Sequence, residues 1–255
     1  MPPHYGQRGS NQSERPEYNV LGPETVCVRL GRLQPCLYLV AVCWRSGTVL
    51  IPRQRPSSSN GTCASISPSV SRGRRYAVIE GEPAYFNFYE TDSPAALTSS
   101  AYLARLNAPT EWTRRVVARF RDTSRTICHV ATSSGVGEGG VIETVRMGTA
   151  RMPKEFIDAM RRDVLVPALA SSGVVAAHLL QGRTADSVGK TAEKALRDQP
   201  DEIADWILLI EAVEVASLHT LRKSASGFSV LERCGVTPGY QRGLYRLQFG
   251  MTHSE

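Results

Sequence analysis

The stretch from Arg74 to Ser133 constrains the fold most, because its apolar pattern changes from strand-like to helical and back again. Arg74–Glu80 and Ala84–Glu90 are rich in aromatic and β-branched residues, and a Gly-Glu-Pro turn separates them, which is typical of a hairpin. A helical pattern follows, and Arg125–Ser133 reads as a third strand. The stretch therefore predicts a β-β-α-β unit.

The chain from Val141 onward shows the same pattern in a longer form. Strands are expected at Val141–Arg146, Val174–Gln181, Asp205–Val213 and Gly239–Gly250, and helices at Pro153–Val164 and Glu214–Cys234. Pro167 should end or kink the first of these helices. The polar segment Arg183–Gln199 reads as an excursion between two strands. We predict an α+β fold with a complete β-α-β-β-α-β repeat at residues 139–250 and an incomplete one at residues 74–134.

Residues 1–73 precede both units and show no helical or strand period that lasts. Between Thr25 and Ile79 there is no acidic residue, and Lys154 is the first lysine of the chain. Two explanations stay open: a naturally disordered tail, or a segment read out of frame in a GC-rich gene, with the true frame resuming just before Arg74. Under both, we expect a segment without regular structure, or in loose contact with the fold, and a first repeat that lacks its first strand and helix.

The net charge of +6 is concentrated in this leading segment. It holds eight Arg, no Lys and three Glu, whereas the remainder is nearly neutral. A nucleic-acid partner is not expected, because binding phosphates would need a basic face on the folded part. The early apolar run Leu37–Trp44 is too short to cross a bilayer, and Pro35 and Cys36 interrupt the approach that a signal peptide would need. We predict no membrane association and a cytoplasmic location.

Neither a metal site nor a cofactor is predicted. No two of the six cysteines have the two-residue spacing of a zinc site. Gly135–Gly140 matches the glycine spacing of a dinucleotide-binding loop, but Val141–Arg146 follows it as a strand, where the pyrophosphate requires a helix N-terminus. We therefore interpret the glycine segment as a flexible connector.

Two stretches resemble known proteins. Val166–Leu169, followed by Gly173–Val174, is similar to the helix-end proline and strand-leading glycine of EthD-like and antibiotic-monooxygenase-like proteins. Leu97–Asn107, together with Pro109 and Trp112–Arg115, resembles a recurrent stretch of uncharacterised bacterial proteins in the same group.

The doubled pattern extends this resemblance to residues 74–250, which resemble the dimeric α/β-barrel superfamily in its fused, duplicated form. The resemblance implies two ferredoxin-like repeats, the first incomplete, that form one α/β barrel with a cavity between them. Some relatives carry a His just before the helix-end proline. This chain has Leu165 and Val166 there, so that His is not carried over. The superfamily contains cofactor-free oxygenases, haem-handling enzymes, isomerases and dehydratases, so the fold alone does not give the activity.

Strand alternation supplies the first candidate site residues. Tyr85, Asn87 and Tyr89 share one face of their strand, and Phe86 and Phe88 share the other. The polar face is the better candidate for lining a pocket that holds an aromatic substrate. The alternative is packing between the two halves of the chain, with the hydroxyl groups paired across it.

Two histidines in predicted strands supply the remaining candidates. His178 lies in the middle of an apolar run, and His129 follows Cys128. A His side chain can act as a base near neutral pH, but each is equally compatible with a hydrogen-bonded structural role. The hypothesis takes His178 and Tyr89 as catalytic residues, and Tyr85, Asn87 and His129 as substrate-binding residues.

Two classes of function stay open. The first is a small-molecule enzyme or binding protein with a cavity between the repeats, performing cofactor-free chemistry on aromatic or polyketide-like compounds. The second is a non-catalytic accessory or assembly protein of the same fold. A ligand in the cavity would favour the first class, and a cavity filled by side chains would favour the second. The expected partners are a small aromatic ligand and, as an open alternative, a second copy of the chain.

Overall fold

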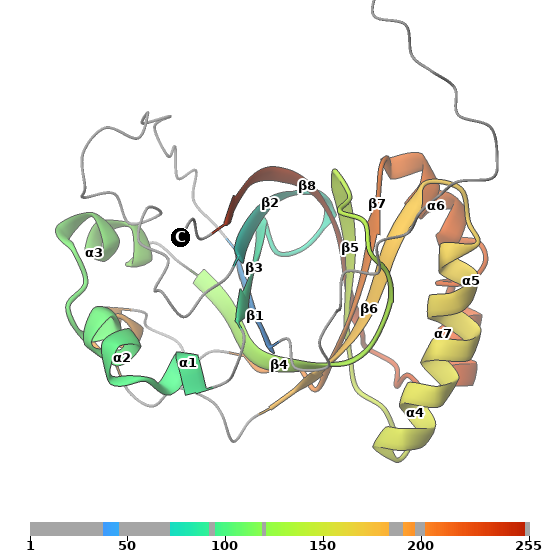
Figure 1. Ribbon diagram of the computed structural model, residues 1–255, viewed down its shortest axis with the longest axis horizontal. Coiled ribbons are helices and arrows are strands. Elements are labelled where there is room, and N and C mark those ends of the chain that lie inside the picture. Colours follow the sequence, from blue (N-terminus) through green and yellow to red (C-terminus); the bar gives the residue numbers. More distant parts are fainter. Residues whose placement is uncertain are drawn as a thin grey trace, which may run out of the picture. The chain divides into compact units, whose positions relative to one another are not determined.

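The computed structural model describes residues 38–45, 72–91, 95–118, 121–183, 191–196 and 202–252. Within these ranges eight antiparallel strands close into a barrel in the order β1-β3-β2-β8-β5-β7-β6-β4 (Figure 1). The strands are β1 (Tyr38–Arg45), β2 (Arg72–Gly81), β3 (Tyr85–Thr91), β4 (Arg121–Gly135), β5 (Val141–Met147), β6 (Val174–Gly182), β7 (Trp206–Ala212) and β8 (Gln241–Thr252).

Each half of the barrel has the strand order of a ferredoxin-like repeat. Strands of the second half lie in the order β8-β5-β7-β6, and those of the first half in the order β4-β1-β3-β2. Both read fourth, first, third, second along the chain, which is the order of a β-α-β-β-α-β unit. The halves join through β2–β8 and β4–β6 pairing. The predicted α+β fold of two ferredoxin-like repeats that form a fused α/β barrel is confirmed.

Strand β1 corrects the prediction for the leading segment. It lies between β3 and β4, and Tyr38 is paired with Thr91 on one side and His129 on the other. The expectation that residues 1–73 lack regular structure is therefore wrong for residues 38–45, and the first repeat has its first strand. The error has a simple cause: the apolar run Leu37–Trp44 has no alternation, so periodicity alone did not identify it as a strand. The other residues before Arg72 lie outside the described ranges.

Helices cover the outer faces of both halves. Beside the second half lie α4 (Pro153–Met160), α5 (Val166–Leu169), α6 (Val215–Arg222) and α7 (Phe228–Cys234). Beside the first half lie α1 (Ala95–Thr98), α2 (Ser100–Asn107) and α3 (Glu111–Val117). Figure 1 shows the two groups on opposite sides of the barrel. The described part of the polar excursion between β6 and β7 contains one short 3₁₀ turn, Lys194–Leu196.

The first helix of the second half continues past Pro167, where the sequence predicts an end or a kink. A π-helical turn, Arg161–Leu165, joins α4 to α5, and the Val166 N–H donates to the Arg161 carbonyl. This wider turn precedes the proline, which has no N–H to donate, so the chain remains helical as far as Leu169.

Alternation along the strands separates the core inside the barrel from the cores beneath the helices. The interior is filled by buried side chains from seven strands: Tyr76, Phe86, Phe88, Cys128, Ile142, Leu180, Ile207, Leu209 and Tyr245. The outer core lies between the second-half strands and their helices and includes Val145, Phe156, Trp206, Leu208, Leu218 and Leu231. On β7, Ile207 and Leu209 point inward, so Glu211, two residues further on, also points into the barrel.

Candidate functional site

A polar cluster closes one end of the barrel interior, which we call the Glu211 end. Glu211 is 1% exposed, and its Oε2 accepts hydrogen bonds from Arg74 Nη1 at 2.7 Å and from the Gly139 backbone N–H at 3.0 Å. Arg74 also lies 3.3 Å from Glu90 through Nη2. The cluster thus joins β2 and β3 of the first half to β7 of the second half.

His178 on β6 belongs to this cluster. Its Nδ1 lies 2.6 Å from Ser133 Oγ on β4, and its Nε2 lies 3.8 Å from Glu211 Oε1. The carboxylate beside Nε2 favours a proton on that nitrogen, so Nδ1 accepts the hydrogen bond and Ser133 donates it. The side chain keeps 21% of its surface exposed.

Burial sets the protonation state of His178. Desolvation lowers its pKa below the ordinary value of 6.5; Glu211 opposes this effect, and the positive charge of Arg74 adds to it. The ring is therefore neutral at pH 7, which is the form that can accept a proton.

Tyr76 and Arg74 both contact the ring of Phe88. The Arg74 guanidinium carbon is 4.1 Å from the centre of the Phe88 ring, and the Tyr76 ring stacks on the same residue with centroids 5.9 Å apart. Among the described residues, neither Arg74 Nε nor the Tyr76 hydroxyl has a hydrogen-bond partner, although both atoms are buried. Burial raises the pKa of Tyr76, so its hydroxyl keeps its proton at neutral pH.

The glycine segment Gly135–Gly140 lies at the Glu211 end and is held there. Its Gly137 N–H donates to the Val175 carbonyl, Gly139 N–H donates to Glu211, and Glu138 pairs with Arg72. A Cβ on Gly139 would come within 2.4 Å of the Ala212 carbonyl oxygen, so glycine permits this close approach. The segment predicted as a flexible connector is a tethered loop beside the site.

Tyr85, Asn87 and Tyr89 lie on the outer face of β3, away from His178. Tyr89 packs near Leu97 and Ile127 under the first-half helices. Phe86 and Phe88, on the opposite face of β3, are the residues of this strand that point inward. The aromatic rings of Phe86 and Phe88 belong to the interior core, while Tyr89 packs on the outer side. Any function of these three residues stays a prediction.

His129 also points away from the barrel interior, because its neighbour Cys128 points inward. Its Nδ1 is buried and has no partner among the described residues. Desolvation, followed by the nearby Arg183, lowers the pKa of His129 below 6.5. The structure therefore brings His178, but not His129, to the polar cluster.

Sequence reasoning missed Arg74, Ser133 and Glu211 as members of the site. Glu211 had a visible signal: it is the acidic residue in the apolar run Trp206–Ala212, at an inward position. Such a residue in a buried strand needs a partner. The partner, Arg74, lies 137 positions away along the chain, and spacing does not identify it.

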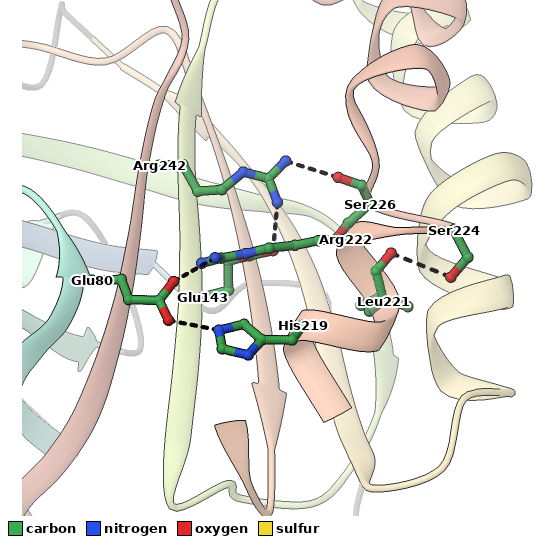
Figure 2. Close-up of polar contacts among 8 residues, drawn as sticks. All are labelled: Glu80, Glu143, His219, Leu221, Arg222, Ser224, Ser226 and Arg242. Atoms are coloured by element: carbon green, nitrogen blue, oxygen red, sulfur yellow. Dashed lines mark hydrogen bonds and ion pairs between the residues drawn. The ribbon is translucent and has the colours of Figure 1, made fainter. Parts of the chain in front are cut away.

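A second polar cluster lies outside the barrel, between β5, β8 and α6 (Figure 2). Its centre is Glu143, which is 0% exposed. Glu143 accepts hydrogen bonds from Arg222 Nε, from Arg242 Nη1 at 2.9 Å and from Ser226 Oγ at 3.3 Å. Arg242 also donates to the Ser226 carbonyl at 2.8 Å.

Glu80 extends this cluster to the first half of the chain. Arg222 Nη1 lies 2.6 Å from Glu80 Oε2, and His219 Nε2 lies 2.6 Å from Glu80 Oε1 (Figure 2). These hydrogen bonds, from Arg222 first and His219 second, lower the pKa of Glu80. The charged groups of this cluster contact one another. We therefore interpret the cluster as a structural link between α6 and β2.

A pocket of about 190 Å³ opens where β5 ends and β7 and β8 begin, away from the Glu211 end. Its lining includes Arg146, which pairs with Glu202 at 3.5 Å and with Gln241. None of the predicted site residues lines this pocket.

The described residues contain neither a metal-binding group nor a membrane-spanning helix. Among them, no three His, Cys, Asp or Glu side chains come together as a group that could hold a metal ion. Likewise, no helix in the described ranges is both long and apolar enough to cross a bilayer.

Comparison with known proteins gives the class through structure and not through sequence. No protein-family model and no curated protein matches this sequence. An anthrone-oxidase-like protein aligns over 88% of this chain and 95% of its own, with a TM-score of 0.58 and 13% identity. A proposed monooxygenase from Fusobacterium nucleatum subsp. nucleatum aligns over 86% of this chain and 94% of its own, with a TM-score of 0.51 and 9% identity.

At these identities the likeness shows the fold alone. The closed barrel of two ferredoxin-like halves and these neighbours define the class of protein, the dimeric α/β-barrel fold. Within that class the chain is the fused form, because one polypeptide supplies both halves of the barrel and both sides of the polar cluster.

Proposed function

We propose that the protein is a small-molecule enzyme whose reaction takes place at the Glu211 end of the barrel, with His178 as the proton acceptor. The observation that carries this proposal is the connected set Ser133–His178–Glu211–Arg74, in which a neutral His has a hydroxyl on one nitrogen and a buried carboxylate near the other. Buried charged groups cost folding free energy, and their concentration around one reachable His supports a catalytic role.

The geometry supports proton abstraction by a relay. A substrate proton passes to Ser133 Oγ while the Ser133 proton passes to Nδ1 of His178. The imidazolium that forms is stabilised by Glu211, whose Oε1 lies 3.8 Å from Nε2. The reverse transfer returns the proton and restores both residues.

The substrate class in the proposal is a small aromatic or polyketide-like compound with an acidic C–H or O–H group. The descriptions of the neighbours, an anthrone-oxidase-like protein and a proposed monooxygenase, are compatible with that class. With an anthrone, loss of the proton gives a carbanion that O₂ can oxidise. One anthrone and one O₂ then give one anthraquinone and one water, and no further cofactor is needed for the electron balance.

Anthrone serves as the probe for this proposal. Without O₂, the protein should accelerate exchange of the anthrone methylene protons with deuterium, followed by NMR. With O₂, it should accelerate anthraquinone formation. His178→Gln should slow the exchange about 100-fold or more, since general base catalysis contributes on the order of 10²–10⁴-fold.

His129→Gln is the matched control, because it changes a half-buried His that points away from the barrel interior. It should leave the exchange rate unchanged, and so should Tyr89→Phe on the outer face of β3. If His178→Gln exchanges anthrone protons as fast as the parent protein, the proposal is wrong.

The filled barrel interior favours a second candidate, a non-catalytic accessory protein. Among the described residues, nine buried side chains occupy the middle of the barrel, which is what the accessory class predicts. The two candidates differ in ligand binding: an accessory protein should show no thermal shift with anthrones, aryl ketones or phenols. A shift that His178→Gln abolishes would exclude this candidate.

A further inference from the structure

We infer that the Glu211 end binds the oxygen of a neutral carbonyl group, with Arg74 Nε–H and the Tyr76 hydroxyl as its donors, and that it rejects carboxylates. This inference rests on the proposed function and names the substrate class of the same site. Two features of the cluster support it: hydrogen-bond donors that have no partner, and the balance of charge around these donors.

Two buried donors remain unused within the described structure. Arg74 is 7% exposed and Tyr76 is 0% exposed. The terminal nitrogens of Arg74 pair with Glu211 and Glu90, which leaves Nε without a partner. An arginine nitrogen can only donate, so an oxygen acceptor is what this position lacks. A buried donor without an acceptor carries a cost of about 1–3 kcal/mol, and a ligand oxygen would remove it.

The Tyr76 hydroxyl lies on the same side of the strand. Tyr76 and Arg74 are two residues apart on β2, so both point into the barrel, and both contact the ring of Phe88. The two side chains that carry these donors therefore pack against the same aromatic ring. A planar aromatic ketone combines the two features that this arrangement can recognise, a ring and an acceptor oxygen.

The charge balance selects against anions. Arg72 and Arg74 face three carboxylates, those of Glu90, Glu138 and Glu211. The formal charge of this group is therefore negative even with both arginines counted. A ligand carboxylate would lose its hydration next to like charges, which is unfavourable. A ketone oxygen enters without charge and still accepts both hydrogen bonds.

The same donors would serve the proposed reaction. Removal of a proton next to a ketone moves negative charge onto the carbonyl oxygen. Donors that are already in place stabilise that charge more in the transition state than in the bound ketone. Tyr76 and Arg74 would then be the oxygen-binding partners of the base, His178.

Three ligands of similar shape test the inference: anthrone, 9,10-dihydroanthracene, which lacks the carbonyl oxygen, and anthracene-9-carboxylate. Dissociation constants are measured by NMR titration at pH 7.5. The parent protein should bind anthrone more tightly than dihydroanthracene and should bind the carboxylate at least tenfold more weakly than anthrone. Tyr76→Phe keeps the stacked ring and should weaken anthrone binding on the order of fivefold, the value of one net hydrogen bond. Its binding of dihydroanthracene should not change.

Tyr245→Phe is the matched control. Tyr245 is also fully buried in the interior, but its hydroxyl is directed toward Gly243. Gly243 is paired with Gly81, seven residues from the Arg74–Gly250 pair along β2 and β8. Removing that hydroxyl should leave the preference for anthrone unchanged.

Several results would overturn the inference. Equal binding of anthrone and dihydroanthracene by the parent protein would do so, and this comparison needs no variant to fold. Equal loss in Tyr76→Phe and Tyr245→Phe, or tight binding of the carboxylate, would do so as well. If His178→Gln still abolishes proton exchange in those cases, the proposed function stands and only the assignment of the donors fails.

Discussion

At the scale of single residues, Glu211 makes this end of the barrel interior polar. It is an acidic side chain at an inward position of an otherwise apolar strand, and it brings Arg74 and the Gly139 N–H to the same place. Without it, the inward face of β7 would continue the apolar core formed by Ile207 and Leu209. One carboxylate thus converts the end of a packed interior into a polar site.

The protonation of His178 leads to a prediction about stability against pH. Its pKa in the folded protein is below 6.5, so as the pH falls the unfolded chain binds the proton first. Stability should therefore be lost as the pH decreases from about 6.5 through the folded-state pKa. Unfolding midpoints in urea between pH 5 and 7.5 should fall more steeply for the parent protein than for His178→Gln. Equal slopes would contradict the assigned direction of the shift.

The catalytic pH profile should follow the same group. Proton exchange of anthrone needs neutral His178, so the rate should fall as the ring becomes protonated and should reach half of its maximum below pH 6.5. An inflection above pH 6.5 would assign the proton acceptor to another residue.

At the scale of elements, helix α6 is fastened to strands of both halves. Arg222 on α6 contacts Glu143 on β5 and Glu80 on β2 (Figure 2). These contacts differ in environment, because Glu143 is fully buried and 41% of the Glu80 side chain is exposed. The same arginine therefore has one partner shielded from water and one that water screens.

Substituting each partner should separate the two environments. Glu143→Gln leaves two arginines without a buried counter-charge and should lower the free energy of unfolding by about 3–5 kcal/mol. Glu80→Gln should lower it by less than about 1 kcal/mol, because solvent screens an exposed pair. Urea denaturation of both variants measures the difference. If the two variants lose similar amounts of unfolding free energy, burial of Glu143 does not strengthen its ion pairs.

At the scale of the whole molecule, one chain supplies both halves of the barrel and both sides of the site. Arg74 and Ser133 come from the first half, and His178 and Glu211 from the second. The site therefore depends on correct closure of β2 against β8 and of β4 against β6. Strand β1 is part of that closure, because it pairs with β3 and β4.

The reading frame of the leading segment is testable at this scale. An out-of-frame segment predicts that another frame of the upstream DNA encodes a strand, an acidic amphipathic helix, and a Pro followed by a Gly just before Arg74. The chain in its present frame predicts a tryptic peptide Leu33–Arg45, which contains all of β1. Mass spectrometry of the protein from its own host distinguishes the two. Detection of Leu33–Arg45 would exclude a frame error in that peptide.

Much of the fold could be predicted because the pattern occurs twice. The strands from β2 to β8 fall close to the predicted ranges, since apolar alternation and glycine or proline turns are local signals. Strand β1 could not be predicted in the same way, because its apolar run only becomes a strand through its pairing with β3 and β4. The continuation of the helix past Pro167 also escaped prediction, since a proline locally signals the end of a helix and the π-helical turn before it has no such local signal.

For the candidate site too, some features follow from the sequence and others only from the tertiary structure. The sequence alone determined that His178 lies within an apolar strand and that Tyr85, Asn87 and Tyr89 share a face, because both follow from alternation. Only the tertiary structure decided which face points into the barrel, since closing a sheet fixes inside and outside through the packing of all of its strands together. It also decided that Arg74, Ser133, His178 and Glu211 meet, because contacts between distant strands depend on register and closure, and no local pattern in the chain records them.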